Sequence, residues 1–505
     1  MNGNNNNHTD PGGDAFFTVN AEEIYPGRHY HAIPRVLVIA LAVAAGFSLL
    51  FIYAMGKEAL SSASDSEKEA LSVVMSEAED ESEETSYNAV YSTIWDAMNE
   101  DVVMISSDGV QLTGIDEETG METVTSAAFY NLLGTSSSVE TRYLADIYGD
   151  TSITYNPLTG IRRYGEKDSI ALTLNCEAQE EMYSYLCQHG VVGFVTVYDY
   201  LTGGILLCVS CPGASSSEDI EDLEEGSLVS RALYSTGSGS TMKIITLLLF
   251  AEQGIDVDSI SYTCSGSYTL ADGSSITCSG SHGEVGIAAA VGYSCNAFFA
   301  HVIENYLDMD RAIETLKELG FEVNGEETDV GVTIGEVPVS SGSITLEPEN
   351  GWDFDNTFCF IGETRIAVNT WMLLQLAAAC AAEEDEVVCS PVFLQEETGS
   401  ASSLFDSFGD ELALVRDIWQ EGCELVAANY PDLSSSCLFL KSGTFETDDA
   451  GSVQKNIVAA SQSLHLAVWV TAENYRVVSD DSVTTLDVTP AVIAAEALEI
   501  VQSVR

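Results

Sequence analysis

The longest apolar stretch of the chain runs from Val36 to Met55 without a charged residue. At about 1.5 Å of rise per residue, a helix over this stretch covers a hydrocarbon core of about 30 Å. Arg28 and Arg35 lie just before it, whereas Glu58 and a block of further acids follow it. The pattern predicts an uncleaved signal anchor, with the N-terminus in the cytoplasm and everything after Met55 outside the membrane.

The segments around this anchor are polar. Residues 1–35, rich in Asn and Gly, are predicted to be a disordered cytoplasmic tail, and residues 36–55 the transmembrane anchor. Residues 56–160 are predicted to be an acidic stalk and a short pedestal, because an intermittent apolar stripe runs among acids up to Asn99. The stretch "DVVMISSDGVQLTG" predicts a hairpin that turns at Asp108-Gly109.

From residue 161 the apolar pattern changes to strands and helices. A helix is predicted to end at Gly190, and a last helix to begin at Pro490 with Thr489 as its N-cap. The predicted strands are "SIALTLN", two strands in "VGFVTVYDYLTGGILLCVS", and "CLFLKSGTF", "NIVAAS" and "LHLAVWVTAE". Because strands flank a central block of helices, residues 161–505 are predicted to form one α+β domain.

The charge of the chain limits its partners. Its 505 residues include 18 Lys plus Arg and 79 Asp plus Glu, a formal net charge of −61. Such a chain repels polyphosphates, so we expect no nucleic-acid partner. The acidity is most simply a solvated surface outside a cell. A calcium site is the alternative, but the sequence contains no strict Asp-x-Asp-x-Asp-Gly loop.

The twelve cysteines are scattered. Because no pair of CxxC motifs makes a zinc site, we predict no metal and no cofactor. Cys208 and Cys211 lie on an apolar strand-like run and are predicted to be buried thiols or a local crosslink. Cys264 and Cys278 flank a loop and would form a disulfide in an oxidising compartment, which the sequence leaves open.

The first candidate catalytic residues lie in "YSTGSGSTMKIITLLLF", a segment whose short apolar run predicts a buried helix. Residues three apart share a helical face, so Lys243 would lie beside Ser240 at the start of this helix. A serine nucleophile needs a base, and a buried lysine in its neutral form can provide one. Ser452 and Lys455 have the same spacing. The spacing alone therefore more often marks a helix N-cap with a surface lysine.

Two further motifs distinguish Ser240 from Ser452. Ser294-Cys295-Asn296 and then Lys441-Ser442-Gly443-Thr444 follow Ser240, and neither follows Ser452. The order S-x-x-K, S-x-N, K-[ST]-G is that of serine β-lactamases and penicillin-binding proteins. Over roughly Ile105 to Arg505, the chain resembles a class B penicillin-binding protein.

This resemblance implies a fold and an activity. The fold would be a penicillin-binding transpeptidase (β-lactamase-like) domain, an antiparallel sheet flanked by helices, with a short pedestal and one transmembrane helix. The activity would be that of a D,D-transpeptidase that cross-links peptidoglycan stem peptides through a serine acyl-enzyme in division or elongation. β-Lactams would inhibit it covalently. A membrane glycan polymerase would be its protein partner.

The resemblance also implies a role for each residue of the motifs. Ser240 is acylated and Lys243 takes its proton. Ser294 relays a proton to the leaving amine, and Lys441 polarises that relay. Asn296 hydrogen-bonds the acyl-amide and holds Lys243.

The last motif supplies the substrate contacts. Ser442, Gly443 and Thr444 are implied to bind the substrate, with the two hydroxyls on its terminal carboxylate. Backbone N–H groups of Ser240 and Thr444 would form the oxyanion hole. The chain departs from the family where "GET", beginning at Gly362, replaces Gly-Gln-Gly.

Other functions compete with transpeptidation. A D,D-carboxypeptidase or a β-lactamase shares the chemistry, but the former often lacks an anchor and pedestal, and the latter needs a deacylating base that the sequence does not reveal. A β-lactam sensor without turnover usually has several membrane spans. An inactive division scaffold would have no need of the complete set of motifs.

Overall fold

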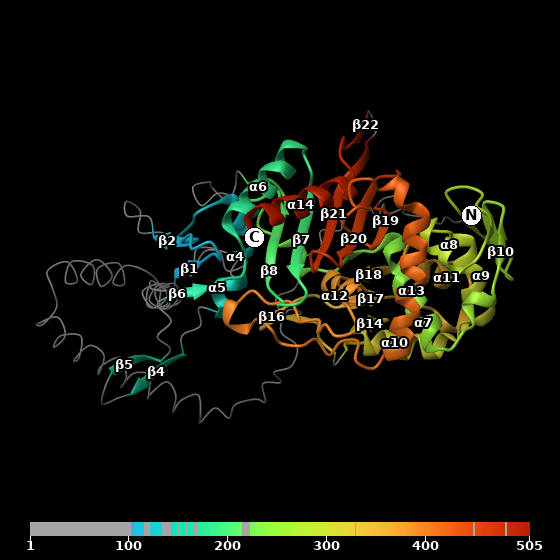
Figure 1. Cartoon of the computed structure of the whole chain (residues 1–505), viewed down its shortest axis with the longest axis horizontal. Helices are drawn as coiled ribbons and strands as arrows, with labels where there is room; N and C mark the ends of the chain where they lie inside the picture. Colours follow the sequence, from blue (N-terminus) through green and yellow to red (C-terminus); the bar gives the residue numbers. More distant parts are fainter. Residues whose placement is uncertain are drawn as a thin grey trace, which may run out of the picture. The chain divides into compact units, whose positions relative to one another are not determined.

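The computed structural model describes residues 103–115, 122–133, 143–148, 152–156, 160–164, 169–214, 223–328, 330–447, 450–479 and 482–505. All of them belong to the compact unit Asp96–Arg505, which is described by itself (Figure 1). The predicted tail 1–35, the predicted anchor 36–55 and most of the predicted stalk lie outside the described residues. Among the described residues, no helix is long and apolar enough to cross a bilayer.

A six-stranded antiparallel sheet forms the centre of this unit. Its order is β19-β20-β21-β7-β8, with β22 paired to β21. These strands are β7 (Gly193–Asp199), β8 (Ile205–Cys211), β19 (Phe439–Glu446), β20 (Val453–Ser461), β21 (Leu466–Ser479) and β22 (Ser482–Thr485). Each position of β7 is buried, because helices cover both faces of the sheet.

Three helices cover the sheet. α6 (Cys176–Gln188) and α14 (Pro490–Val504) pack on one face, and α12 (Thr370–Ala381) packs on the other (Figure 1). The Thr489 hydroxyl caps α14 and Pro490 is its first residue, as predicted. The predicted α+β domain with an antiparallel sheet and flanking helices is confirmed.

A block of helices follows the first two strands of the sheet along the sequence. α7 is buried along almost its whole length and contacts α11 and α13, while α8 contacts α13 and α9 contacts α11. The helices of the block are α7 (Met242–Glu252), α8 (Ile287–Gly292), α9 (Asn296–Tyr306), α10 (Met309–Glu318), α11 (Phe354–Ile361) and α13 (Gly409–Val426).

A smaller sheet of order β14-β17-β18-β9 joins distant segments beside this block. Its strands are β9 (Thr236–Gly237), β14 (Phe321–Val323), β17 (Gly342–Ile344) and β18 (Ile366–Val368). Since β9 leads into α7 and β18 follows α11, the pairing of β9 with β18 brings the segment before Ser240 beside the segment after α11.

The remaining strands pair in twos. They are β10 (Tyr262–Cys264) with β13 (Gly283–Val285), β11 (Ser267–Thr269) with β12 (Ser275–Thr277), β15 (Thr333–Ile334) with β16 (Val337–Pro338), β2 (Thr113–Ile115) with β3 (Glu122–Val124), β4 (Ser152–Asn156) with β5 (Gly160–Tyr164), and β1 (Val103–Ile105) with β6 (Ser169–Ala171). Two short helices, α4 (Ala127–Leu133) and α5 (Tyr143–Tyr148), complete the described elements.

The predicted hairpin at Asp108-Gly109 forms. Gly109 has a φ of 83° in the turn, and the backbone N–H groups of Ser106 and Leu112 donate to the carbonyl oxygens of Val110 and Met104 across the two arms. β1 also pairs with β6, in parallel, which the sequence did not predict. The Asp108 carboxylate accepts a hydrogen bond from the backbone N–H of Cys176 at 2.8 Å, so the turn docks on the start of α6.

Candidate active site

Ser240 lies in a single 3-10 turn, Gly239–Thr241, that runs directly into α7. Gly239 has a φ of 52°, and a Cβ atom there would lie 2.5 Å from the backbone N of Thr444. On the facing strand β19, a Cβ atom on Gly443 would lie 2.4 Å from the carbonyl oxygen of Ser238. Both positions therefore require glycine, because the edge strand and the serine turn meet backbone to backbone.

Lys243 lies one helical turn after Ser240, and its Nζ donates a hydrogen bond to Ser240 Oγ at 2.5 Å. The side chain is fully buried on an apolar helix, with the ring centroid of Phe299 5.8 Å from Nζ. Burial lowers the pKa of Lys243 to about 8, since the charged form loses its hydration. The neutral amine, which can accept the proton of the Ser240 hydroxyl, is therefore populated at a lower pH than in an exposed lysine.

A second lysine and a second serine form a matching pair. Lys441 Nζ donates to Ser294 Oγ at 3.0 Å and to the carbonyl oxygen of Ser442 at 2.8 Å. Burial lowers the pKa of Lys441 well below its usual range, and repulsion from Lys243 lowers it further. The contact of β19 with the Ser240 turn places the two pairs close to each other. The structure thus brings Ser240, Lys243, Ser294 and Lys441 together.

Ser294 reaches this pair through an unusual backbone conformation. Its φ is 56°, in the left-handed region that non-glycine residues rarely adopt. It lies two residues before the start of α9, whose first residue is Asn296. A conformation of this kind costs free energy and persists where the surrounding structure enforces it.

Asn296 lies differently from the expectation. Its Nδ2 donates to the carbonyl oxygen of Thr277 at 2.9 Å, and no hydrogen bond to Lys243 is found among the described residues. The side chain therefore ties the start of α9 to the end of β12. In this structure Lys243 is held instead by Ser240 and, at 3.5 Å, by the carbonyl oxygen of Ile361.

The predicted substrate contacts lie along β19. The hydroxyl oxygens of Ser442 and Tyr430 are 2.8 Å apart, and the side chain of Thr444 is exposed. As noted above, the backbone N of Thr444 lies beside Gly239; a Cβ atom on Gly443 would in turn lie 3.3 Å from the backbone N of Ser240. The two backbone N–H groups predicted for the oxyanion hole are thus close to each other.

Glu363 is an acid near Lys243 and Lys441 for which the motifs predicted no role. A Cβ atom on Gly362 would lie 1.8 Å from the carbonyl oxygen of Gly239, so the "GET" loop is pressed against the serine turn. Burial raises the pKa of Glu363, whereas the charges of Lys243 and Lys441 lower it. The carboxylate in turn raises the pKa of both lysines. No motif marks this residue, and only its departure from the family pattern pointed to it.

Two amides of β20 hold the segment before Ser240. Asn456 Nδ2 donates to the carbonyl oxygens of Gly237 at 2.6 Å and Ser238 at 3.2 Å. Gln454 Nε2 donates to the carbonyl oxygen of Gly237 at 3.0 Å. The sequence signal for this contact is that Gln454 and Asn456, two positions apart, point to the same face of β20.

The second S-x-x-K, Ser452 to Lys455, forms no comparable pair. Ser452 Oγ accepts a hydrogen bond from the backbone N of Val478 at 3.0 Å, while Lys455 Nζ lies 3.9 Å from the ring centroid of Tyr475. Lys455 lies in β20, whose first residue is Val453, and Ser452 immediately precedes the strand; in such an extended backbone, positions three apart point to opposite faces.

All twelve cysteines have free thiols. Cys208 and Cys211 are buried, as predicted. The sulfur atoms of Cys264 and Cys278 are 3.7 Å apart, against about 2.05 Å in a disulfide. The disulfide considered for this pair is therefore not formed in the structure.

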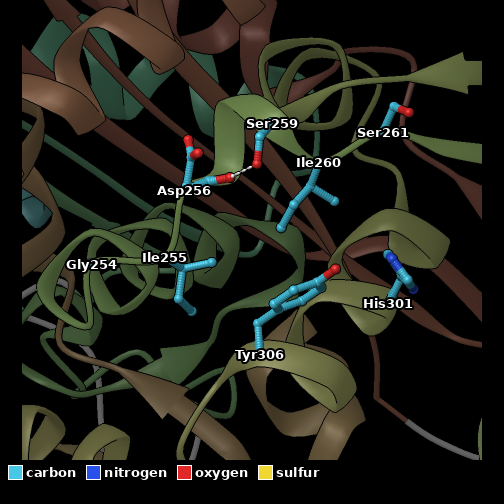
Figure 2. A pocket seen from close by; sticks show the side chains of 8 residues that line it. All are labelled: Gly254, Ile255, Asp256, Ser259, Ile260, Ser261, His301 and Tyr306. Atoms are coloured by element: carbon cyan, nitrogen blue, oxygen red, sulfur yellow. Dashed lines mark hydrogen bonds between the residues drawn. The ribbon is translucent and has the colours of Figure 1, made fainter.

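A pocket of about 510 Å³ lies elsewhere in the helical block (Figure 2). Ile255, Ile260, His301 and Tyr306 line it together with polar groups of the loop after α7. The His301 and Tyr306 rings meet edge to face, with centroids 6.0 Å apart. None of the predicted site residues lines this pocket, so it is separate from the Ser240 cleft.

Comparisons with known proteins agree with this geometry. Residues 193–347 match the family model of the penicillin binding protein transpeptidase domain. No curated protein matches the sequence.

Solved structures match over most of the chain. The penicillin G acyl-enzyme complex of penicillin-binding protein A from Mycobacterium tuberculosis has a TM-score of 0.56 at 17% identity, covering 80% of this chain and 99% of that one. PBP2 from Pseudomonas aeruginosa has a TM-score of 0.58 at 15% identity, with 80% and 95% covered. The D,D-transpeptidase domain of a peptidoglycan glycosyltransferase from Eggerthella lenta has a TM-score of 0.57 at 17% identity, with 80% and 97% covered. At these identities the likeness shows a shared fold.

Proposed function

The chain contains a penicillin-binding-protein transpeptidase domain, and from this premise we propose that it is a class B penicillin-binding protein, a serine D,D-transpeptidase that cross-links peptidoglycan stem peptides. One observation carries the proposal: the hydroxyl of Ser240 is hydrogen-bonded to the buried amine of Lys243, beside the pair formed by Lys441 and Ser294. A hydroxyl activated by a neutral amine, next to a second proton relay, is suited to acyl transfer.

In the acylation step, Ser240 Oγ attacks the carbonyl carbon of the penultimate D-alanine, and the hydroxyl proton passes to neutral Lys243. The oxyanion of the tetrahedral intermediate is stabilised by the backbone N–H groups of Ser240 and Thr444. The carbon–nitrogen bond to the terminal D-alanine then breaks. The proton that Lys243 took passes through the Ser294 hydroxyl, polarised by Lys441, to the leaving amine. D-alanine departs, the rest of the stem peptide stays as an ester on Ser240 Oγ, and Lys243 is neutral again.

In the transfer step, the amine of a second stem peptide attacks this ester. The same groups move protons in the opposite direction, so the amine loses a proton and Ser240 Oγ regains one. An amide bond forms between the two stem peptides and the enzyme is restored. A β-lactam would acylate Ser240 in the same way, as penicillin G does in the acyl-enzyme complex of the Mycobacterium tuberculosis protein.

The hydroxyls of β19 suit an anionic substrate terminus. The chain has a formal net charge of −61, so its surface repels a carboxylate. Ser442 and Thr444 lie on β19, the strand that contacts the Ser240 turn, and their hydroxyls can donate hydrogen bonds to a carboxylate. We assign to these two hydroxyls the binding of the terminal carboxylate.

Hydrolysis by a D,D-carboxypeptidase or a β-lactamase is the second candidate, and Glu363 is the observation that favours it. Its carboxylate faces the charges of Lys243 and Lys441, and burial raises its pKa. Such a group could deprotonate a water molecule that attacks the acyl-enzyme. Transfer is preferred because the proton relay of Lys441 and Ser294 is equally available to an acceptor amine.

The proposed location follows from the sequence. The apolar segment 36–55 would anchor the enzyme, with its N-terminus in the cytoplasm and its cleft on the outer side, beside a membrane glycan polymerase of division or elongation. Protease added to intact cells would then digest the C-terminal domain and spare an epitope placed before residue 35. If the protease digested neither the C-terminal domain nor the epitope, this topology would be contradicted.

Labelling of the full chain with a fluorescent penicillin tests the site. Ser240→Ala should abolish covalent labelling, whereas the matched variant Ser452→Ala should keep it, because the amine of Lys455 lies over the ring of Tyr475. Labelling that survives the first change and is lost with the second would overturn the assignment. For a chain that labels as expected, incubation with a stem-peptide donor and a D-amino-acid acceptor separates transfer from hydrolysis, because only transfer incorporates the acceptor.

A further inference from the structure

Three cysteines and one histidine from separate segments meet next to α9. Cys264 ends β10 and pairs with Gly283 of β13, which brings His282 beside it. Cys278 follows β12, and Cys295 immediately precedes α9. The four side-chain ligand atoms, three Sγ and one ring nitrogen, all lie within 4.8 Å of one another. Among the described residues, this is the one group of at least three such side chains that could hold a metal ion.

The spacing of these atoms matches the edges of a tetrahedral zinc site. The Sγ atoms of Cys264 and Cys278 are 3.7 Å apart, those of Cys278 and Cys295 are 3.8 Å apart, and Cys264 Sγ is 3.5 Å from His282 Nδ1. With Zn–S bonds of about 2.3 Å and Zn–N bonds of about 2.0–2.1 Å, a tetrahedron has S···S edges of about 3.8 Å and S···N edges of about 3.6 Å. A disulfide would instead need two sulfurs about 2.05 Å apart.

The surroundings favour thiolates at this place. The backbone N–H of Ala297 donates to Cys278 Sγ at 3.1 Å, and the backbone N–H of Phe298 bonds Cys295. Both donors belong to the first turn of α9, whose dipole is positive at this end. Hydrogen bonds to ligating sulfurs are the usual outer contacts of zinc–thiolate sites.

We propose that Cys264, Cys278, His282 and Cys295 bind one zinc ion. Four protein ligands close the coordination shell, which is the arrangement of a structural rather than a catalytic zinc. Binding replaces the remaining thiol protons, which pass to solvent. The sequence predicted no metal because these four positions contain no CxxC pair, and strand pairing is needed to bring them together.

The site would act on the catalytic cleft through Cys295, which lies between Ser294 and Asn296. Ser294 is held at a φ of 56° and contacts Lys441, while Asn296 bonds Thr277, the residue before Cys278. A metal ion would therefore tie the turn that carries Ser294 to the β10–β13 region. The metal ligands would thus position Ser294. This positioning role rests on the proposed function, whereas the metal site itself does not.

The first experiment measures zinc in the purified full chain by mass spectrometry of the metal. The expected result is about one zinc per chain, falling at least fivefold in Cys278→Ser and in His282→Ala. Cys389→Ser is the matched control, since Cys389 is also a buried thiol, and its hydrogen bond to the carbonyl oxygen of Leu201 can be made by a hydroxyl. This control should keep its zinc.

Cobalt substitution of the unmutated chain provides a readout that does not depend on a variant folding. One equivalent of Co²⁺ should produce thiolate-to-cobalt charge transfer and the visible bands of tetrahedral coordination. His282 is half-buried in a loop, so His282→Ala remains informative even if Cys278→Ser does not fold. Zinc well below stoichiometric together with a Cys264–Cys278 disulfide, or zinc that all these variants retain, would overturn the site.

The effect of the metal on the position of Ser294 is tested by a separate measurement. Removing zinc with a chelator should slow penicillin acylation at least fivefold, and added zinc should restore the rate. If the metal content behaves as expected but acylation is unchanged, the metal site holds and its effect on Ser294 is refuted. If the chain never labels with penicillin, the proposed function fails while the metal measurement still decides the site.

Discussion

The chain contains the pattern Gly-Ser-x-x-Lys twice, and only one copy brings its hydroxyl and amine together. In Gly239–Lys243 the serine lies in a 3-10 turn that opens a helix, and Nζ and Oγ are 2.5 Å apart. In Gly451–Lys455 the serine and lysine lie at the start of a strand. Three residues cover most of a helical turn, but they reverse the face of a strand. The same five-residue pattern therefore brings a hydroxyl and an amine together only where the backbone repeats every 3.6 residues.

The two lysines also differ in their surroundings. Lys243 is fully buried on an apolar helix, and this burial lowers its pKa to about 8. Lys455 is half-buried and lies over the ring of Tyr475, a contact that attracts an ammonium group. One environment disfavours the charge and the other accommodates it. Spacing alone carries no information about this difference.

The largest expected effect on penicillin acylation comes from removing Lys243, with the removal of Lys455 as the comparison. Lys243→Ala should lower the second-order rate of penicillin acylation by about 10²–10⁴, because Ser240 then lacks its base. Lys455→Ala should leave that rate within about twofold. Stopped-flow acylation of both variants measures the two rates. Equal losses in the two variants would mean that the burial of Lys243 does not prepare it as the base.

The glycines before the two serines provide the next comparison. An Ala side chain at Gly239 would collide with the backbone of Thr444, whereas at Gly451 nothing lies within 4 Å of the added Cβ atom. Both glycines have positive φ values, 52° and 91°, so both substitutions carry backbone strain of about 1–2 kcal/mol. Gly239→Ala adds an overpacking cost of about 1–3 kcal/mol.

Thermal unfolding should therefore show a clearly larger drop in melting temperature for Gly239→Ala than for Gly451→Ala. Only the first variant should also lose acylation, because β19 is displaced from Ser240. Equal melting temperatures would show that the strand does not press on the serine turn.

The parts of the fold that follow from local pattern could be predicted. The strands on either side of the turn at Gly203 and the cap at Thr489 depend on short-range alternation and turn chemistry. The hairpin at Asp108-Gly109 follows from the same local signals. The parallel pairing of β1 with β6 could not be predicted, because the two strands are far apart in sequence.

The candidate site divides in the same way. The order of the three motifs can be read directly from the sequence, and it identified Ser240, Lys243, Ser294 and Lys441 as candidates. The bond of Asn296 to Thr277, the acid at Glu363 and the cysteine–histidine cluster depend on contacts between loops. No spacing rule along the chain describes such contacts, so the sequence could not show that Asn296 bonds Thr277 or that the four cysteine and histidine side chains lie together.

A smaller effect is expected at the second hydroxyl–lysine pair. Ser294→Ala should lower acylation by about 10- to 10²-fold, the cost of one hydrogen bond to a charged or polarised group. Lys441→Ala should cost a similar factor. The double variant should lose much less than the product of the two factors, because both residues serve one proton relay. Strictly multiplicative losses, measured by the same acylation assay, would separate the two residues functionally.

The smallest expected effect is a shift in the pH dependence of acylation when Glu363, which lies near Lys243, loses its charge. Acylation needs neutral Lys243, so its rate should rise as the pH passes the pKa of this lysine, about 8. The Glu363 carboxylate raises that pKa, and Glu363→Gln removes the charge at nearly constant shape. The rise should therefore begin at a lower pH, with a gain at pH 7 of less than about tenfold. Rate profiles from about pH 6 to about pH 9 measure the midpoint, with the exposed Glu326→Gln as control. A midpoint that stays in place or moves upward would mean that the carboxylate does not act on Lys243.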